Sequence, residues 1–225
     1  MLTIVIPTLN AQSELVPTLE SLMPGVLDGL AVQLVIADGG SVDATLAIAD
    51  EAGANIVRTP TGRGGQLRAG AGRARGAWLL FLHADTRLGS GWVDEVKTFI
   101  RDRGPEKAGY FRYCLDDRRW RARLLEGAVA LRSKVLALPY GDQGLLVSRL
   151  LYDRIGGFGP LPLMEDVDIA RRLGRARLHP LATRAVTSAA RYRRDGYMWR
   201  SVRNLTCLAG FFLGVAPERL ARFYR

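Results

Sequence analysis

Short apolar runs alternate with amphipathic stretches up to about residue 105 of the chain. The apolar runs are rich in β-branched residues, which is typical of strands buried in a parallel sheet. A strand–helix–strand rhythm of this kind predicts right-handed crossovers and a mostly parallel sheet in an α/β fold. We predict strands at Leu2–Pro7, Val32–Asp38, Ala54–Thr59 and Ala77–Asp85, and helices at Ser13–Met23 (with Ser13 as the N-cap), Val42–Gly53 and Gln66–Arg75.

The pattern changes beyond residue 105. No linker-like segment separates the two parts, so we predict one domain over residues 1–225. Its first half, 1–104, is of a nucleotide-binding type, 105–190 form a second half, and 191–225 form a C-terminal helical segment. In these later parts we predict strands at Gly109–Leu115 and Gly144–Ser148, an extended segment at 176–188, helices at Trp120–Leu136 and Glu165–Gly174, and helix from Asp195 with a break near Pro217.

The chain is strongly basic, with a net charge of +10 and a pI of 10.3. Such a field favours anionic partners. Nearly all of the positive charge is arginine, which suits bidentate phosphate contacts, although a compositional bias explains the choice equally well. The two cysteines, Cys114 and Cys207, lie far apart, which excludes a disulfide framework or a zinc cluster of cysteines.

The N-terminal stretch lacks the basic region and small-residue cleavage site of a secretory signal. No apolar run reaches the ~20 residues needed to cross a bilayer. We therefore expect a cytoplasmic protein. The short apolar segment Cys207–Val215 packs against the domain by default. Contact with the inner face of a membrane, or homodimerisation, through these C-terminal helices is the alternative.

Polar groups follow each of the first four predicted strands. In an open parallel sheet, ligands bind beyond the carboxyl ends of the strands, so these groups are expected to meet at one edge. Asp38 could accept hydrogen bonds from a nucleoside, Arg63 could meet phosphate, and Asp85 could hold a divalent cation. A single polar segment after a strand is usually an ordinary turn without a ligand, but four such segments at the same edge of the sheet indicate a ligand crevice. The four segments are Pro7–Asn10, Asp38–Asp43, Thr59–Gln66 and His83–Asp85.

The order and spacing of five motifs resemble the family 2 glycosyltransferases, which have the GT-A fold. The motifs are IVIPTLNA, VIADGGSVDAT, GRGGQLRAGAGRARGAWLLFLHADT, GDQGLLVS and GGFGPLPLMEDVDIARRL, and the resemblance covers roughly residues 1–180. It implies a metal-dependent, inverting transfer of a sugar from a nucleotide-sugar, usually a UDP-sugar, to a hydroxyl acceptor, with Mg²⁺ or Mn²⁺ as cofactor.

The resemblance also implies roles for particular residues. Asp85 matches the last acid of the family's metal-binding DxD motif, and Asp166 matches the general base, with Glu165 beside it. Acids at this position also suit the first turn of a helix whatever their function. The nucleotide-sugar-binding set is Pro7, Thr8, Asn10, Asp38, Gly39, Arg63, Gln66, Ala84 and Asp85.

The sequence departs from the family pattern at two positions. His83 stands at the first position of DxD, where it is either a second metal ligand or a neutral replacement. Arg68 stands where relatives carry asparagine, and it either meets phosphate or points to solvent. His179 is a candidate third ligand or a surface or core histidine. Asp142 and Gln143 are expected either to contact the sugar or acceptor or to form an ordinary turn.

Other classes of protein fit less well. A sugar-nucleotide nucleotidyltransferase would carry a glycine-rich basic loop after the first strand, and a dinucleotide dehydrogenase would carry GxGxxG there; PTLNA is neither. A nucleic-acid-binding protein is consistent with the charge, but the basic residues are spread along the chain, so we expect no nucleic-acid partner. The acceptor is expected to be a small soluble or a lipid-linked molecule.

Overall fold

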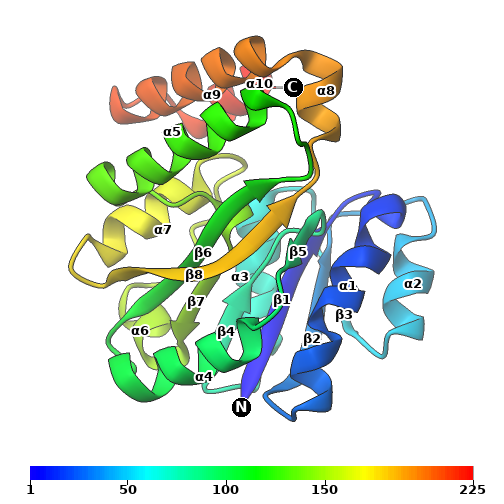
Figure 1. Cartoon of the computed structure of the whole chain (residues 1–225). Helices are drawn as coiled ribbons and strands as arrows, with labels where there is room; N and C mark the ends of the chain where they lie inside the picture. Colours follow the sequence, from blue (N-terminus) through cyan, green and yellow to red (C-terminus); the bar gives the residue numbers. More distant parts are fainter. Residues whose placement is uncertain (225) are drawn as a thin grey trace.

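The computed structural model describes residues 1–224, and its strands form one eight-stranded sheet (Figure 1). The strand order is β3-β2-β1-β4-β7-β6-β8-β5. The strands are β1 (Leu2–Thr8), β2 (Ala31–Asp38), β3 (Asn55–Arg58), β4 (Trp78–Phe81), β5 (Thr86–Leu88), β6 (Ala108–Leu115), β7 (Leu145–Ser148) and β8 (Leu178–Thr187).

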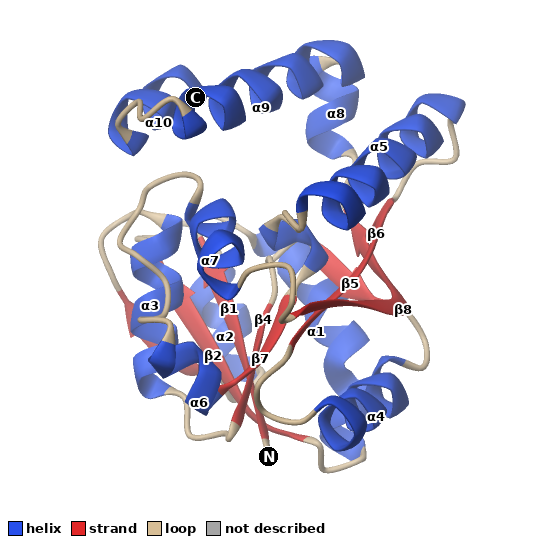
Figure 2. Cartoon of the chain, turned by 90° about the vertical axis from the view of Figure 1, so that its left-hand side faces the viewer, coloured by secondary structure: helices blue, strands red, loops and turns tan. Residues whose placement is uncertain are grey.

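Helices cover both faces of this sheet (Figure 2). The helices are α1 (Gln12–Leu27), α2 (Thr45–Glu51), α3 (Arg63–Arg73), α4 (Trp92–Arg103), α5 (Trp120–Leu136), α6 (Arg149–Arg154), α7 (Glu165–Leu173), α8 (Ala190–Asp195), α9 (Tyr197–Phe212) and α10 (Pro217–Tyr224), with a 3₁₀ turn, η1, at Gly141–Gln143.

The predicted α/β class is confirmed, and the first four strands pair in parallel as predicted. The predicted mostly parallel sheet is also observed, since four of its seven strand pairings are parallel. The antiparallel pairings are those of β7 with β4 and β6 and that of β5 with β8. The reversed direction of β7 follows from the connection after β6. Helix α5 and η1 keep the chain at the end of the sheet where β6 stops, so β7 must run back.

Alternate residues of the central strand supply two separate cores. Leu2, Ile4 and Ile6 of β1 pack with α1 and α4 on one face, where Trp92 is fully buried. Val5 points to the other face, where α3, α6 and α7 cover the sheet. Burial on both faces explains why β1 reads as a continuous apolar run. The sheet is thereby a rigid support for the residues that follow its strands.

Several predicted boundaries move. Helix α1 begins at Gln12 after Ala11, so Ser13 lies inside the helix and the N-cap prediction is wrong. The helix also continues to Leu27, since a proline in the last turn costs only one backbone hydrogen bond. Strand β4 ends at Phe81, before the polar residues of the LLFLHADT stretch. Within residues 1–224, no helix is both long and apolar enough to cross a membrane.

The C-terminal helices lie at the end of the sheet toward which β1 and β6 point (Figure 1). Arg200 of α9 joins α9 to α8 and α10 by hydrogen bonds. Its Nη1 donates to Asp195 Oδ2 (3.0 Å) and its Nη2 to the Tyr224 hydroxyl (3.2 Å). Arg200 is buried although it is charged, so these partners compensate its desolvation. Helix α10 is thereby held beside the carboxyl ends of the parallel strands.

Candidate active site

The carboxyl edge of the parallel strands opens into a cleft of about 710 Å³, which we call the outer cleft. Segments after β1, β3 and β4 form one side of it, and α8 and α10 contribute the other. The predicted convergence of these segments is therefore observed. The outer cleft is lined by Pro7, Thr8, Asn10, Thr61, Gly62, Arg63, Gln66, His83, Ala84, Asp85, Ser188, Arg191 and Tyr224, among others.

Asp38 shapes the edge of the outer cleft but does not line it. Its carboxylate accepts hydrogen bonds from the hydroxyls of Thr8 and Ser41 and from the backbone N–H groups of Gly40 and Ser41. Burial opposes its charged form, but these hydrogen bonds outweigh burial and lower the pKa of Asp38. Its acceptor sites are thus used within the protein. This corrects the expectation that Asp38 holds the nucleoside directly.

Gln66 has a similar internal role. Its side-chain Nε2 donates to the carbonyls of Thr8 and Ala37, both at 2.8 Å, and so ties the ends of β1 and β2 together. Gly39 lies against this amide: a Cβ at position 39 would come within 3.0 Å of Gln66 Nε2. Gln66 lines the outer cleft and is held in place by these contacts, whereas Gly39 is buried and does not line the cleft. Position 39 has room for the Gln66 amide because it carries no side chain.

Asn10 fixes the loop after β1. It adopts a left-handed conformation (φ 50°), which asparagine tolerates better than most residues. Its Oδ1 accepts from the Val42 N–H at 2.9 Å, and its own N–H donates to the Ser41 hydroxyl at 2.8 Å. The loop after β2 is thereby joined to the loop after β1 and holds Asn10 at the wall of the outer cleft.

His83 and Asp85 occupy a tight turn after β4. The Thr86 N–H donates to the His83 carbonyl (3.2 Å), and the Ser188 N–H donates to the Asp85 carbonyl (3.1 Å). His83 Nε2 is buried and has no hydrogen-bond partner among the described residues. Burial lowers the pKa of His83 well below 6.5, and the positive charges of Arg63 and Arg191 add to this. The imidazole is therefore neutral, as a metal ligand must be.

Beyond His83 and Asp85 the outer cleft continues into a second, smaller cavity of about 100 Å³, which we call the inner pocket. The inner pocket shares several residues with the outer cleft, among them Tyr224. Its further lining consists of three tyrosines, two carboxylates, an amide, an arginine, a methionine and a threonine: Tyr113, Tyr140, Tyr192, Asp142, Asp166, Asn204, Arg200, Met164 and Thr187.

Three buried oxygens in the inner pocket lack a partner among residues 1–224, namely the Tyr113 hydroxyl oxygen, Asp142 Oδ1 and Asn204 Oδ1. Buried polar atoms are rarely left unpaired, so these atoms indicate a polar ligand. Burial raises the pKa of Asp142 to about 7; Arg132 opposes the shift, and the negative charges of Asp166 and Asp85 reinforce it. Asp142 therefore can hold a proton near neutral pH.

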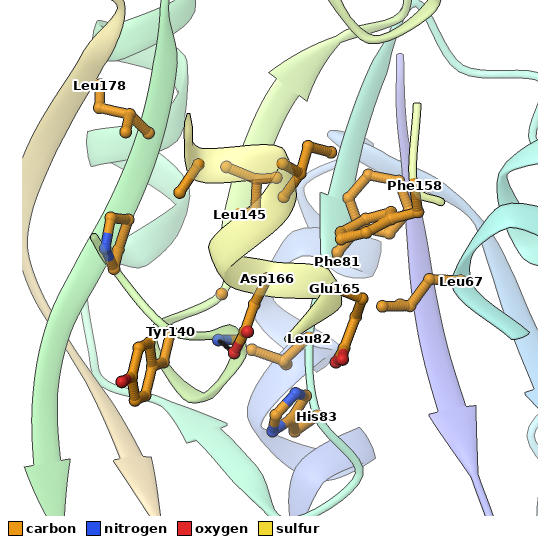
Figure 3. Close-up of a pocket in the computed structure, with 15 residues that line it drawn as sticks. Leu67, Phe81, Leu82, His83, Tyr140, Leu145, Phe158, Glu165, Asp166 and Leu178 are labelled. Atoms are coloured by element: carbon orange, nitrogen blue, oxygen red, sulfur yellow. Dashed lines mark hydrogen bonds between the residues drawn. The ribbon is translucent and has the colours of Figure 1, made fainter. Parts of the chain in front are cut away.

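The start of α7 presents two acids to this region. Met164, directly before the helix, has φ 64°, an uncommon conformation for a non-glycine residue that turns the chain sharply into α7. Asp166 Oδ2 accepts from the Gly141 N–H at 2.9 Å and faces the inner pocket. Figure 3 shows Glu165 and Asp166 projecting from α7 toward the side on which His83 lies.

Glu165 differs from Asp166 in its surroundings. It is almost completely buried and forms an ion pair with Arg63, with Glu165 Oε1 3.3 Å from Arg63 Nη1. Burial raises its pKa, and the Arg63 charge opposes but does not cancel this. A small apolar pocket lies behind both acids and lowers the local dielectric (Figure 3). Its walls include Leu67, Phe81, Leu145, Phe158 and Leu178.

Three other candidates lie elsewhere. Gln143 is buried: its amide accepts from Ser133 and donates to the Phe111 carbonyl, so it supports η1 rather than a ligand. Arg68 is exposed and lines none of the three cavities. Of the two predicted alternatives, contact with phosphate or exposure to solvent, the structure therefore shows the second.

His179 is the third. It pairs with Gly109 at the start of β8, eight residues before Thr187, which lines the inner pocket. At about 3.3 Å per residue, His179 is roughly 26 Å from that end of the strand. The proposal of His179 as a metal ligand is therefore wrong.

Sequence reasoning missed the aromatic and amide side of the inner pocket. Tyr192, Asn204 and Tyr224 come from C-terminal helices for which the sequence indicated packing, membrane contact or homodimerisation but no part in the site. Tyr113 lies inside a strand rather than after it.

A divalent metal would find two side-chain donors here, a neutral imidazole and a carboxylate. Among residues 1–224 no group of three or more His, Cys, Asp or Glu side chains could hold a metal ion alone. His83 and Asp85 nevertheless fit a site completed by ligand oxygens, since Mg²⁺ is commonly held by one or two protein groups plus phosphates. The unpartnered Nε2 of His83 is the observation that supports this fit.

Comparison with known proteins gives one family and several relatives. Residues 3–159 match the family model described as glycosyl transferase family 2. A PGL/p-HBAD biosynthesis glycosyltransferase of Mycobacterium tuberculosis is 35% identical over 124 residues, which cover 49% of this chain and 45% of that protein. A protein of the same name from Mycobacterium bovis gives the same figures. The chain spans about half the length of the curated relatives it matches.

Solved structures are similar in fold at low identity. TarS 1–349 of S. aureus superposes with a TM-score of 0.65 at 15% identity, covering 99% of this chain and 70% of that chain. Glucosyl-3-phosphoglycerate synthase from Mycobacterium tuberculosis, in complex with Mn²⁺ and UDP-glucose, superposes with a TM-score of 0.58 at 20% identity, covering 84% of this chain and 69% of that chain. These similarities confirm the predicted fold.

Proposed function

The chain belongs to glycosyl transferase family 2 and has the GT-A fold, and from this premise we propose that it moves a sugar from a UDP-sugar to a hydroxyl acceptor with inversion and with the help of a divalent metal. The observation that carries the proposal is the continuity of the outer cleft with the inner pocket across His83 and Asp85. A donor in the outer cleft and an acceptor in the inner pocket can thus come into contact beside His83 and Asp85. Nothing in the structure favours a nucleotidyltransferase or a nucleic-acid-binding protein instead.

The outer cleft suits the donor. Pro7, Thr8 and Asn10 would hold the nucleoside, and the backbone of Gly62 and the side chain of Arg63 approach from the start of α3. The N-terminus of a helix favours anions, and a guanidinium adds a full positive charge there. UDP is the preferred nucleotide because the synthase that shares the fold has been solved with UDP-glucose.

The wall between the cavities suits a metal bound to the diphosphate. Asp85 and His83 would hold Mg²⁺ or Mn²⁺, which is supported by the presence of Mn²⁺ or Mg²⁺ with UDP in the synthase structures. The bound metal would neutralise the charge that develops on the leaving diphosphate. Arg63 supplies part of the same stabilisation from the protein.

We assign the role of general base to Asp166. It faces the inner pocket, and the Gly141 N–H fixes one of its oxygens. The acceptor oxygen would attack the anomeric carbon while its proton passes to the Asp166 carboxylate. The bond between that carbon and the diphosphate oxygen breaks, and the diphosphate leaves as an anion. One displacement of this kind inverts the anomeric centre.

The inner pocket suits a polar acceptor. Asp142 Oδ1 and Asn204 Oδ1 are acceptors without donors, and the tyrosines supply flat surfaces on which a sugar ring or an aromatic ring can pack. We assign Asp142, Tyr113 and Asn204 to the acceptor. A small hydroxylated molecule, free or linked to a lipid, matches this lining.

A thermal-shift panel tests the donor assignment. UDP-, GDP- and dTDP-sugars are compared with and without Mn²⁺, for the wild type and for Asp85→Ala. We expect the UDP-sugars to raise the melting temperature only when Mn²⁺ is present, and Asp85→Ala to abolish the shift. Absence of stabilisation by every nucleotide-sugar would contradict the proposal, and a shift that survives Asp85→Ala would contradict the metal assignment.

A further inference from the structure

Helix α5 exposes a continuous apolar stripe. Trp120, Leu124, Leu131 and Val135 are all at least half exposed. At about 100° per residue they lie within about 60° of one another on the helix surface, with the small residues 127 and 128 between them. The opposite side of α5 packs on β6 through the buried residues Ala122 and Val129. The stripe therefore faces away from the core.

Helix α9 carries a second stripe at the same end of the molecule. Both helices lie beside α8 in Figures 1 and 2, and the Tyr197 hydroxyl at the start of α9 donates to Asp117 just before α5 (2.8 Å). The α9 stripe recurs every three or four residues, and α9 contains no acidic residue. Its exposed members are Met198, Val202, Leu205, Ala209 and Phe212, with Trp199 beside them.

Basic side chains flank the α5 stripe. The Arg121 guanidinium lies 5.5 Å from the centre of the Trp120 ring. The one acid of α5, Glu126, is occupied by Arg123 and by the Leu115 N–H. The exposed basic residues in α5 and directly before it are Arg118, Arg119, Arg121, Arg123 and Lys134.

We propose that the α5 and α9 stripes dock on the surface of an anionic lipid bilayer. A helix face of tryptophan and leucine with arginine and lysine at its borders is suited to the boundary between headgroups and acyl chains. Negative lipids attract the basic border. A second copy of the chain fits less well, since a symmetric contact through α5 would bring the same basic borders together.

The docked orientation also bears on the acceptor. Helices α8, α9 and α10 supply Arg191, Asn204 and Tyr224 to the inner pocket, so docking would place that pocket close to the lipid headgroups. A lipid-linked acceptor would then reach it without leaving the bilayer. This last step rests on the proposed function, whereas the docking itself does not.

Vesicle co-sedimentation without any donor tests the docking. Vesicles of phosphatidylcholine alone are compared with vesicles that contain about one third phosphatidylglycerol. We expect the wild type to bind the anionic vesicles at least about tenfold more tightly than the neutral ones, and less tightly as salt is raised. Failure of the wild type to bind anionic vesicles, or equal binding to both kinds, overturns the docking proposal and leaves the transferase proposal untouched.

Three variants locate the surface. Leu124→Glu with Leu131→Glu is expected to lose binding at least about tenfold, and Arg118→Gln with Lys134→Gln to lose the preference for anionic lipid. Leu27→Glu, which changes a still more exposed leucine at the end of α1, should bind as the wild type does. All positions are exposed, and thermal unfolding checks the fold. Unchanged binding by the stripe variant overturns the proposal, and so does a dimer in sedimentation velocity that this variant dissociates.

Discussion

Arg63 Nη1 lies 3.3 Å from Glu165 Oε1, and this ion pair joins the first residue of α3 to the first residue of α7. The loop before α7 packs equally closely on α3: the Gly64 N–H donates to the Leu161 carbonyl (3.1 Å), and a Cβ at position 64 would come within 2.3 Å of the Gly159 carbonyl. The donor side and the catalytic acids are therefore held in one fixed arrangement. Arg63 serves both, since it also lines the outer cleft and the inner pocket.

Arg63→Ala should weaken UDP binding by about tenfold, because a charge-assisted contact to the diphosphate is lost. It should also lower the melting temperature, since Glu165 is left buried without its partner. Isothermal titration with UDP and Mn²⁺ measures the first effect. Arg68→Ala is the matched control, because Arg68 lies on the same helix, is exposed and lines none of the cavities. Equal UDP affinity in both variants would show that Arg63 does not contact the donor.

Asp166→Asn should lower kcat by about 10²–10⁴-fold, because the amide cannot take the acceptor proton. UDP binding and the KM for the donor should stay near the wild-type values, since Asp166 does not line the outer cleft. Steady-state kinetics and UDP titration on the same preparation separate the two effects. An Asp166→Asn enzyme that retained its kcat would remove Asp166 from the role of base.

Sequence reasoning located the donor side of the site because that side depends on a local rule. Residues just after parallel strands share one edge of the sheet, so Thr8, Asn10 and Asp85 could be grouped without coordinates. The same rule could not predict that the hydrogen-bond acceptor sites of Asp38 are used within the protein. This use depends on Thr8, thirty positions earlier, and on a turn that brings Ser41 back to the carboxylate.

The acceptor side could not be predicted because it is assembled from distant elements. Tyr113 points into the inner pocket from within β6, and Asn204 and Tyr224 reach it only because α9 and α10 fold back over the sheet. His179, in contrast, was a candidate site residue that lies away from the site. The sequence could not tell which end of β8 would meet the site, and the histidine lies at the other end.

Asp142→Asn should stabilise the protein, and the gain should grow with pH. Burial raises the pKa of Asp142 from 3.8 to about 7 in the folded state. The folded protein therefore keeps a proton that the unfolded chain has lost, and wild-type stability falls as pH rises between these values and levels off above about 7. The asparagine side chain does not ionise, so the variant does not lose this stability as pH rises. Allowing for partial exposure, we expect a gain of about 2 kcal/mol at alkaline pH, or about 5 °C in Tm.

Thermal unfolding of Asp142→Asn across the range from pH 4 to pH 8 measures this gain. Asp50→Asn, which changes an exposed carboxylate on α2, is the control. A pH-independent difference for Asp142→Asn would mean that its carboxylate is solvated like an ordinary one. Loss of acceptor turnover in the same variant would support its assignment to the inner pocket.

His83→Gln should weaken Mn²⁺-dependent UDP binding by about tenfold or more, because an imidazole ligand is replaced by a weaker donor. UDP binding without metal should change little. His179→Gln is the matched control, since it alters the other histidine of the chain at the far end of β8. If His83→Gln and His179→Gln bind UDP with the same affinity in the presence of Mn²⁺, His83 is not a metal ligand and is only a neutral replacement for the acid of the DxD motif.

Gly141→Ala tests the same imidazole from its other side. A Cβ at position 141 would lie 2.5 Å from His83 Nε2 and 3.0 Å from its Cε1, so the ring must move. We expect Mn²⁺-dependent UDP binding to fall as in His83→Gln, with about 1–3 kcal/mol of lost stability from overpacking. Gly72→Ala on α3, where an added Cβ meets nothing within 4 Å, should keep full binding.

The double variant Gly141→Ala with His83→Gln separates this effect from one on Asp166, whose carboxylate accepts from the Gly141 N–H. Two changes that act through one group are not additive. If the alanine acts by displacing the imidazole, the double variant should bind UDP and Mn²⁺ no more weakly than His83→Gln alone. A further loss of about tenfold in the double variant would instead place the effect of Gly141 on a group other than His83.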